Sequence, residues 1–302
     1  MKRLVVFLTM SLAGAAACAG TPIDKTLDVP AHVTVSIQNI KGEVNVTGWN
    51  RNQVRITGTL GKGALPLRVE QHGDSVHIEV KAAGRKGWFN WRSDDDMDPT
   101  TLHVQVPLAA SLDVDTVSAA TRVRSLSGGT LAAKSVSGRV QVDADSPRAQ
   151  VQTVSGDVRL AGAFDRVQVQ TVSGDIQAGK VHRNAELQTV SGHVRLMGGP
   201  FVEASLNSVS GDIEVSGSLQ ANGRMRADSV SGDVLLALPS ATSALLHVAS
   251  FSGSIRSAFG GQVQDNRRGP GSSLGDTLGS GNGRIEVQTF SGDVSLRRAD
   301  AQ

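Results

Sequence analysis

The segment Thr153-Val154-Ser155-Gly156-Asp157-Val158 recurs, with small changes, along more than half of the chain. It opens with a four-residue phrase: Ser or Thr, an apolar residue, Ser, and nearly always Gly. Ten copies lie between residues 116 and 293, with the second Ser at positions 118, 127, 137, 155, 173, 191, 210, 231, 252 and 291. Because self-similarity at a fixed period is typical of stacked repeats, the phrase predicts an array of similar units.

The spacing of the phrase indicates the size of one unit. The central copies are 18, 18, 18, 19, 21 and 21 residues apart, whereas the first two steps are 9 and 10 residues. A helix–turn–helix repeat needs more than about 30 residues, and a propeller blade about 40. Two or three short strands with their corners fit the observed spacing, at about 3.3 Å per strand residue. The sequence therefore predicts an all-β fold, a parallel β-solenoid of about 9 to 11 short, β-helix-like coils.

Apolar residues alternate with polar ones on both sides of the phrase, as in half-buried strands. Positions are counted from the second Ser of each phrase. In a straight strand, positions −6, −4 and −2 would point to one face, and positions −1, +3 and +5 would point to the opposite face. Both sets can face the core only if the chain bends directly after the first Ser or Thr, so we expect the apolar residue at −1 to be buried. Gly at +1 gives this corner backbone freedom, and the hydroxyls are expected to satisfy backbone groups. A second corner is predicted at Gly162, Gly179, Gly198 and Gly217, with Gln150, Gln152, Gln168 and Gln170 pointing outward.

The coils are expected to form one domain over residues 20–302. Residues 111–297 carry the regular phrases, and residues 20–110 form less regular coils in which Asn39-Ile40-Lys41-Gly42 is a divergent first copy. Two excursions interrupt the coils, at residues 84–99 and 257–284, and the second is expected to be a mobile loop because it is rich in Gly, Ser, Arg and Asn. Further strands are expected at residues 53–57, 67–70, 75–80 and 102–106.

Residues 1–19 have the pattern of a signal peptide: Lys2-Arg3, an apolar run and then small residues. The only cysteine is Cys18, for which two interpretations stay open. Ala17-Cys18-Ala19 fits a signal-peptidase site that releases a soluble protein, whereas the small residues before Cys18 fit a weak lipobox, in which that cysteine is lipidated. We expect an exported protein of the periplasm or cell surface, free or lipid-anchored. No later segment approaches the about 20 apolar residues of a membrane span.

Composition narrows the classes of partner. Removal of residues 1–19 takes away two basic residues and no acidic one, which leaves 28 Lys and Arg against 28 Asp and Glu. A formally neutral chain is not expected to bind nucleic acid through its bulk charge. Tyr is absent and aromatic residues make up only 3% of the chain, which suits narrow coils better than a thick sandwich.

Three stretches resemble the bacterial putative-adhesin family, whose members are exported β-strand repeat domains of unknown function. These are Ile40-Lys41-Gly42-Glu43-Val44-Asn45-Val46-Thr47-Gly48-Trp49, the Val-Pro at 106–107 before Leu112-Asp113-Val114, and the repeated Val-Ser-Gly-Asp-Val. The resemblance covers roughly residues 30–297. It implies a right-handed parallel β-solenoid at the cell envelope with no established catalytic residues. The chain departs from the family in its Trp-Phe-Asn-Trp loop and in the half-length spacing of its early phrases, so the coil register near residues 116–137 stays open.

Two groups of carboxylates are candidates for metal ligands. The first is the column at +2, formed by Asp157, Asp175, Asp212, Asp233 and Asp293, in which neighbours would lie about 4.8 Å apart. Ca²⁺ could relieve their repulsion, but His193, Ser254 and Arg139 interrupt the column, and we expect solvated, turn-forming Asp. The second is Asp94, Asp95, Asp96 and Asp98, which lack the Gly and distal Glu of an EF-hand loop. We therefore expect no metal and regard this cluster as a weak candidate.

Aromatic residues gather just before that acidic cluster. Trp88, Phe89 and Trp91 could stack on sugars, touch a membrane surface or anchor a partner. The alternative is that they cap the open end of the solenoid or cover its flank. They are the candidate binding residues.

No catalytic constellation is visible in the sequence. The serines recur as a ladder without a paired base, and Gly279-Ser280-Gly281-Asn282-Gly283 lacks the Lys-Ser or Lys-Thr of a phosphate loop. We expect no catalytic residue and no cofactor. The favoured function is a non-enzymatic envelope adhesin or scaffold that presents a rigid surface to an envelope protein or glycan. The alternatives are a polysaccharide-active enzyme on a β-helix and a sensor of envelope state.

Overall fold

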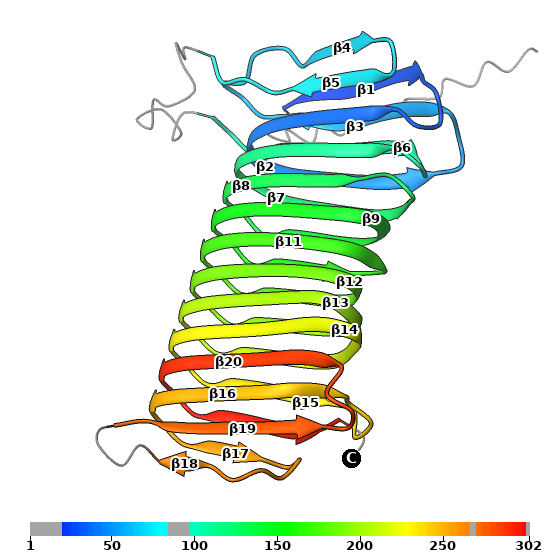
Figure 1. Cartoon of the computed structure of the whole chain (residues 1–302). Helices are drawn as coiled ribbons and strands as arrows, with labels where there is room; N and C mark the ends of the chain where they lie inside the picture. The colour runs from blue at the N-terminus through cyan, green and yellow to red at the C-terminus, as the bar shows by residue number, and fades with distance from the viewer. Residues whose placement is uncertain (1–19, 84–96, 266–269, 300–302) are drawn as a thin grey trace, which may run out of the picture.

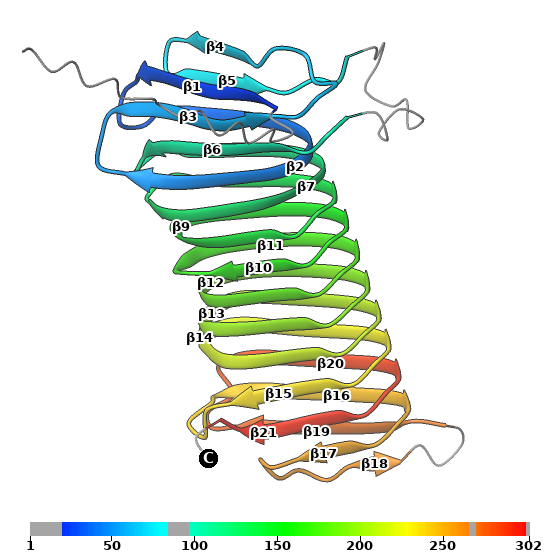
Figure 2. The same ribbon diagram turned by 180° about the vertical axis from the view of Figure 1, so that it is seen from behind.

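The computed structural model describes residues 20–83, 97–265 and 270–299. Over these residues the regular elements are β-strands, and they stack into one elongated body (Figures 1 and 2). The all-β, solenoid-like repeat expected from the sequence is therefore confirmed. The same residues contain no helix with the length and hydropathy needed to cross a membrane.

The strands fall into three groups along the stack. The N-terminal group is β1 (Thr21–Asp28), β2 (Thr34–Trp49), β3 (Gln53–Leu60), β4 (Arg68–His72), β5 (Ser75–Glu79) and β6 (Thr100–Pro107). The central group is β7 (Ser111–Ser127), β8 (Leu131–Ser137), β9 (Val140–Ser155), β10 (Val158–Ala161), β11 (Phe164–Ser173), β12 (Ile176–Ser191), β13 (Val194–Ser210), β14 (Ile213–Ser231) and β15 (Val234–Leu238). The C-terminal group is β16 (Ala244–Ser252), β17 (Ile255–Ser257), β18 (Gln264–Asp265), β19 (Ser272–Leu278), β20 (Gly283–Ser291) and β21 (Val294–Arg298). Strands β3, β4, β5 and β6 correspond to the four extra strands expected in the N-terminal part.

Each coil has two arms, which lie on two faces of the stack. The first face consists of the arms that lead to the Ser-Gly corner, and the second face consists of the arms that follow it. Neighbouring arms of the coils pair in parallel and in register: Val169 lies between Val151 and Leu187 on the first face. On the second face Ile176 lies between Val158 and Val194 in the same way. Like side chains therefore form continuous inward columns, which make the buried core.

Glycine at the corner is required by the neighbouring coil. A Cβ on Gly174 would collide with the carbonyl oxygen of Gly156, and a Cβ on Gly192 would collide with that of Gly174. Their φ angles, 153° and 142°, also lie in the region that favours glycine. The second corner has the same character at Gly162, Gly198 and Gly217, where a Cβ would meet the backbone of the previous coil. A Cβ on Gly179 would lie at ordinary contact distance, 3.6 Å from the carbonyl oxygen of Leu160.

The order of the coils departs from chain order at both ends. The first half of β2 lies between β5 and β7, and its second half lies between β6 and β7. At the other end, β20 lies between β14 and β16, and β21 lies between β15 and β17. The first coil, β2, thus has a later strand on each side, and the last coil, β20 and β21, has an earlier strand on each side (Figure 2).

Antiparallel strands close the two ends of the stack. β1, β3 and β6 pair antiparallel at the N-terminal end, beside the β4–β5 hairpin. β16, β19 and β18 do the same at the C-terminal end. Such short antiparallel additions cover the sheet edges on which other chains could otherwise pair.

Three sequence expectations need correction. The phrase that ends at Ser127 pairs with Asp145 at the opposite edge, which explains the half-length spacing: it marks the second corner of its coil. The segment 257–284 was expected to be a mobile loop, but it contains β19, which pairs with β16 and covers the edge of the first face. The apolar residues at −1 were expected to be buried. Instead, those from Val154 onward are about half exposed and Val117 and Val136 are partly exposed, whereas Leu126, in the half-length phrase, is buried.

Candidate functional site

The apolar residues at −1 of the stacked coils form one continuous line along the Ser-Gly edge, which we call the apolar ridge. Its rows from Val154 onward are about half exposed, and Ile40, Val117 and Val136 are partly exposed. In spatial order it consists of Ile40, Val117, Val136, Val154, Val172, Val190, Val209, Val230, Phe290 and Phe251, rows 1 to 10. The five valines from Val154 to Val230 are each 47–50% exposed. A contiguous exposed apolar strip of this kind marks an interaction surface more often than a lone exposed residue does.

The ridge exists because the bend lies one step later than the sequence suggested. In the coil around Ser173, Thr171 at −2 is buried, Val172 at −1 and Ser173 are exposed, and Ile176 at +3 is buried again. Strand alternation continues through −1, and the chain turns at Ser-Gly. The turn therefore places the apolar residue outside, and parallel stacking repeats that placement in every coil.

Phe251 and Phe290 form the aromatic end of the ridge. Their rings are stacked, with centroids 4.6 Å apart and planes inclined by 9°. They are 56% (Phe290) and 46% (Phe251) exposed. They meet only because β20 is inserted beside β16, which brings together two residues that are distant in the sequence.

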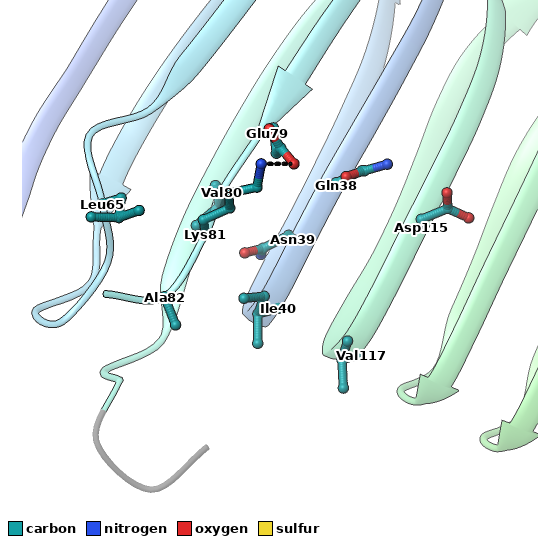
Figure 3. A pocket seen from close by; sticks show the side chains of 10 residues that line it. All are labelled: Gln38, Asn39, Ile40, Leu65, Glu79, Val80, Lys81, Ala82, Asp115 and Val117. Carbon is teal, nitrogen blue, oxygen red and sulfur yellow. Dashed lines mark ion pairs between the residues drawn. The ribbon is translucent and has the colours of Figure 1, made fainter. Parts of the chain in front are cut away.

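A pocket of about 470 Å³ lies at the other end of the ridge. Figure 3 shows Ile40 of β2 and Val117 of β7 side by side, with Ala82 next to Ile40 and Leu65 on the far side of the segment 80–82. Lys81 and Glu79 form an ion pair on the pocket wall, with Nζ 2.8 Å from Oε1. The mouth is thus apolar, with a few polar groups around it.

Asp115 also lines this pocket. Burial of its carboxyl group raises its pKa, and the nearby Asp113 raises it further, whereas Lys134 lowers it. This end of the ridge therefore carries a carboxyl group that is more easily protonated than an exposed one.

Amides and carboxylates border the ridge on its two sides. On the first face, position −3 carries Gln152, Gln170, Gln188 and Asn207 in neighbouring coils. On the second face, position +2 carries the Asp column. The ridge thus has a largely uncharged side and an acidic side.

The Asp column is explained by hydrogen bonds between coils. The amide of Asp175 donates to Oδ1 of Asp157 at 3.3 Å, and the amide of His193 donates to Oδ1 of Asp175 at 2.9 Å. The pattern continues from Asp233 to Asp212, from Asp293 to Asp233 and from Ser254 to Asp293. The donor hydrogen bond from Ser254, with Arg256 nearby, lowers the pKa of Asp293. Over the residues that the structure describes, no group of three or more His, Cys, Asp and Glu side chains is placed to hold a metal ion.

The inward hydroxyls at −2 behave differently from the expectation. Thr289 and Ser250 donate to the carbonyl oxygens of Gly232 and Gly292. In contrast, five buried hydroxyls have no hydrogen-bond partner within the described structure: Thr153, Thr171, Thr189, Ser208 and Ser229. Satisfaction of backbone groups therefore does not account for the whole Ser/Thr column.

Most candidate residues from the sequence lie outside the described part of the chain. This applies to Trp88, Phe89 and Trp91, to Asp94, Asp95 and Asp96, and to Cys18. Asp98 is described: it is exposed, and its amide donates to the carbonyl oxygen of Lys62 at 3.0 Å. The sequence analysis did not predict the ridge, although one signal could have revealed it. The residue at −1 is apolar in every copy, but strand alternation from the inward positions −6, −4 and −2 places it on the outward side.

Comparisons with known proteins agree with this architecture. A family model described as Toastrack DUF4097 matches residues 32–297. A solved structure from Parabacteroides distasonis, named a putative lipid binding protein, is similar with a TM-score of 0.54 and 13% identity, over 92% of this chain and 97% of that chain. At this identity the likeness shows the fold alone.

Two further solved structures align less well. A putative adhesin from Bacteroides fragilis has a TM-score of 0.41 and 12% identity, over 91% of this chain and 97% of that chain. A putative cell adhesion protein from Clostridium sporogenes has a TM-score of 0.22 and 11% identity, over 92% of this chain and 100% of that chain. No curated protein matches the chain.

Proposed function

The chain belongs to the Toastrack DUF4097 family, and we propose that it is a non-enzymatic cell-envelope adhesin or scaffold that binds its partners through the apolar ridge. The single observation that carries this proposal is the unbroken line of apolar side chains at −1 over ten stacked coils, with seven of these side chains about half exposed. Burial of exposed apolar surface against a partner is favourable at about 25 cal/mol per Å². A stack held in register presents such a line without deforming.

The remaining parts of the proposal come from the sequence. Residues 1–19 act as the export signal, residues 20–302 form one domain, and the protein acts in the periplasm or at the cell surface, free or anchored through Cys18. The coils wind in the right-handed sense, as β–crossover–β connections in general do. The partner is an envelope protein or a glycan, and Trp88, Phe89 and Trp91 form a second binding element.

A pull-down from envelope extracts tests the role of the ridge. Immobilised protein carrying Val172→Glu and Val190→Glu should lose most of the bound material, because the two substitutions place charges in the middle of the apolar line. Met197→Glu is the matched control, since Met197 is 39% exposed and lies outside the ridge. Equal recovery with the ridge variant and the control would contradict the proposal.

The aromatic segment needs a separate variant. Deletion of residues 84–99 should reduce the bound material only if Trp88, Phe89 and Trp91 contact the partner. Unfolding must be monitored in parallel by circular dichroism, because a cap would lower stability without changing what the folded protein binds.

A further inference from the structure

We propose that the apolar ridge is covered by the ridge of a second copy of this chain, in an antiparallel dimer with two-fold symmetry. This inference rests on the proposed function, in that it takes the ridge as the interaction surface and names its partner. A two-fold axis between rows 5 and 6 brings row 1 of one copy to row 10 of the other. A symmetric interface of this kind must be self-complementary.

The two ends of the ridge are complementary in shape. Row 10 and row 9 carry the stacked rings of Phe251 and Phe290, about half exposed. Rows 1 and 2, Ile40 and Val117, line the mouth of the apolar pocket of about 470 Å³. The antiparallel arrangement places the aromatic end of each copy over the pocket end of the other. Aromatic anchors over apolar pockets are the usual centres of binding energy.

Charge decides between the antiparallel and the parallel arrangement. Row 3 is bordered by Lys134 at −3 and Arg139 at +2, and row 8 is bordered by Asp228 and Asp233 at the same positions. The antiparallel axis keeps each border on its own side. Lys134 then meets Asp228, which Arg226 of its own chain also contacts at 2.6 Å. Arg139, which lies 3.4 Å from Asp157 of its own chain, meets Asp233. A parallel two-fold dimer exchanges the borders and sets Lys134 against Arg139, with two carboxylates together at row 8. Like charges placed opposite each other disfavour an interface.

The central rows fit the same arrangement. On the first face, Gln152 faces Asn207, and Gln170 faces Gln188, so that amides can hydrogen-bond to each other across the axis. On the second face, Asp157 approaches Asp212. Each of these carboxylates already has a partner in its own chain, since Arg139 lies 3.4 Å from Asp157 and His193 lies 3.4 Å from Asp212.

The strip formed by the ridge and its two borders is large enough for a specific dimer. The nine steps between its ten rows, at about 4.8 Å each, give a length of about 43 Å, and the five steps from −3 to +2, at about 3.3 Å each, give a width of about 16 Å. The strip therefore covers roughly 700 Å² on each copy, just below the about 800 Å² per partner of a standard interface. We expect reversible association that depends on protein concentration.

Sedimentation velocity of the purified protein over a range of concentrations tests the dimer. Wild type should shift from monomer to dimer, and Val172→Glu or Val190→Glu should weaken association by more than about tenfold, because each dimer then buries two charges in an apolar seam. The control Met197→Glu, outside the ridge, should associate like wild type. A circular dichroism melt of each variant separates lost association from lost folding.

A charge exchange tests the orientation. Lys134→Glu and Asp228→Lys should each weaken self-association by about fivefold or more, because like charges then meet at two places in each dimer. When the two variants are mixed, opposite charges meet again, so a heterodimer should form with an affinity near that of wild type. The double variant should also recover self-association. In a parallel dimer, Lys134→Glu would face Arg139 and Asp228→Lys would face Asp233, so each single variant would strengthen self-association instead of weakening it.

The outcomes separate this inference from the proposed function. A wild-type protein that stays monomeric at all accessible concentrations, or a dimer that survives both ridge variants, would overturn the second copy as partner. If the ridge variants of such a monomer still lose binding to envelope material, the adhesin or scaffold proposal stands. If the dimer forms as described and no envelope material binds, the adhesin or scaffold proposal falls and the dimer remains.

Discussion

The Gly that follows the second Ser in nearly every phrase is dictated by the coil beneath it. In Gly174 and Gly192 a positive φ and the carbonyl oxygen of the previous Gly both exclude a side chain. The Asp that follows is explained equally locally, because its carboxylate accepts the amide of the next coil. Both residues therefore act between coils, and their repetition is structural.

Replacement of Gly174 by Ala should destabilise the protein by about 1–3 kcal/mol, from backbone strain and the collision with Gly156. Thermal or urea denaturation measures the change. Gly275→Ala on β19 is the control, since no atom lies within 4 Å of its Cβ position. Equal stability of the two variants would contradict the steric account of the corner.

Replacement of Asp293 by Asn should lower the melting temperature at neutral pH and reduce the loss of stability in acid. The pKa of Asp293 is lowered by the amide of Ser254. Its stabilisation is therefore fully present above the pKa of an unfolded Asp, about 3.9, and is lost as the pH falls through the lower folded pKa. Melting curves from pH 7 to acid should show the difference between wild type and variant shrinking below that value. Asp143→Asn, an exposed position on β9, serves as the control, and a difference that does not change with pH would oppose this explanation.

At the scale of the strands, the ends of the stack are more firmly held than a plain spiral would allow. The last strands of the chain, β20 and β21, have a neighbour on each side. In a stack built in chain order they would lie at an open end and fray. The insertion also creates the Phe251–Phe290 pair, so the same arrangement that covers the last coil completes the ridge.

Truncation of Leu296 on β21 should therefore cost as much as truncation of a central residue. Leu296 is 2% exposed and Leu206 on β13 is fully buried. Leu296→Ala and Leu206→Ala should each destabilise by about 2–5 kcal/mol, measured by chemical denaturation. A loss below about 0.5 kcal/mol for Leu296→Ala alone would mean that the last coil frays independently.

The whole molecule is a stack whose repeated residues are accounted for by packing, and its family membership confirms the resemblance to adhesin-like domains of unknown function that was seen in the sequence. The regular spacing of the coils places Val, Ser, Gly and Asp in rows. A nucleophile or general acid would break such rows with a singular, well-partnered side chain. Among the described residues, His193 interrupts the Asp column and lies 3.4 Å from Asp212, with both side chains exposed.

Incubation of the purified protein with envelope glycans should give no depolymerisation products, because the carboxylates of the Asp column accept hydrogen bonds from the amides of the next coil. Chromatography of the glycan before and after incubation is the measurement. Turnover that survives repurification of the protein, and that is lost on substitution of a carboxylate in the Asp column, would replace the adhesin or scaffold proposal with an enzymatic one.

Much of the fold could be predicted from the sequence, because each coil is built by local rules, but the candidate site, the apolar ridge, could not. The period of the phrase defines the coil, alternation defines the inward columns, and Gly defines the corner. The burial of Val154 or Val172 could not be predicted with the same certainty. The alternation of apolar residues allows the chain to bend either before or after these valines. If it bends before them they face the core, and if it bends after them they face solvent; the stacking of neighbouring coils decides where the bend lies.

The sequence by itself determined the stacked all-β architecture, the corners and the inward rows, since these follow from spacing and alternation within about 18 residues. The tertiary structure alone decided the order of the coils at the two ends, the aromatic pair and the pocket. The physical reason is that coils with the same columns are interchangeable partners: Ser231 matches Ser291 in register, and Ser291 also matches Ser252. Pairing rules that are satisfied by every coil cannot specify which coil lies next to which, and that choice is made by the connections and the packing of the whole stack.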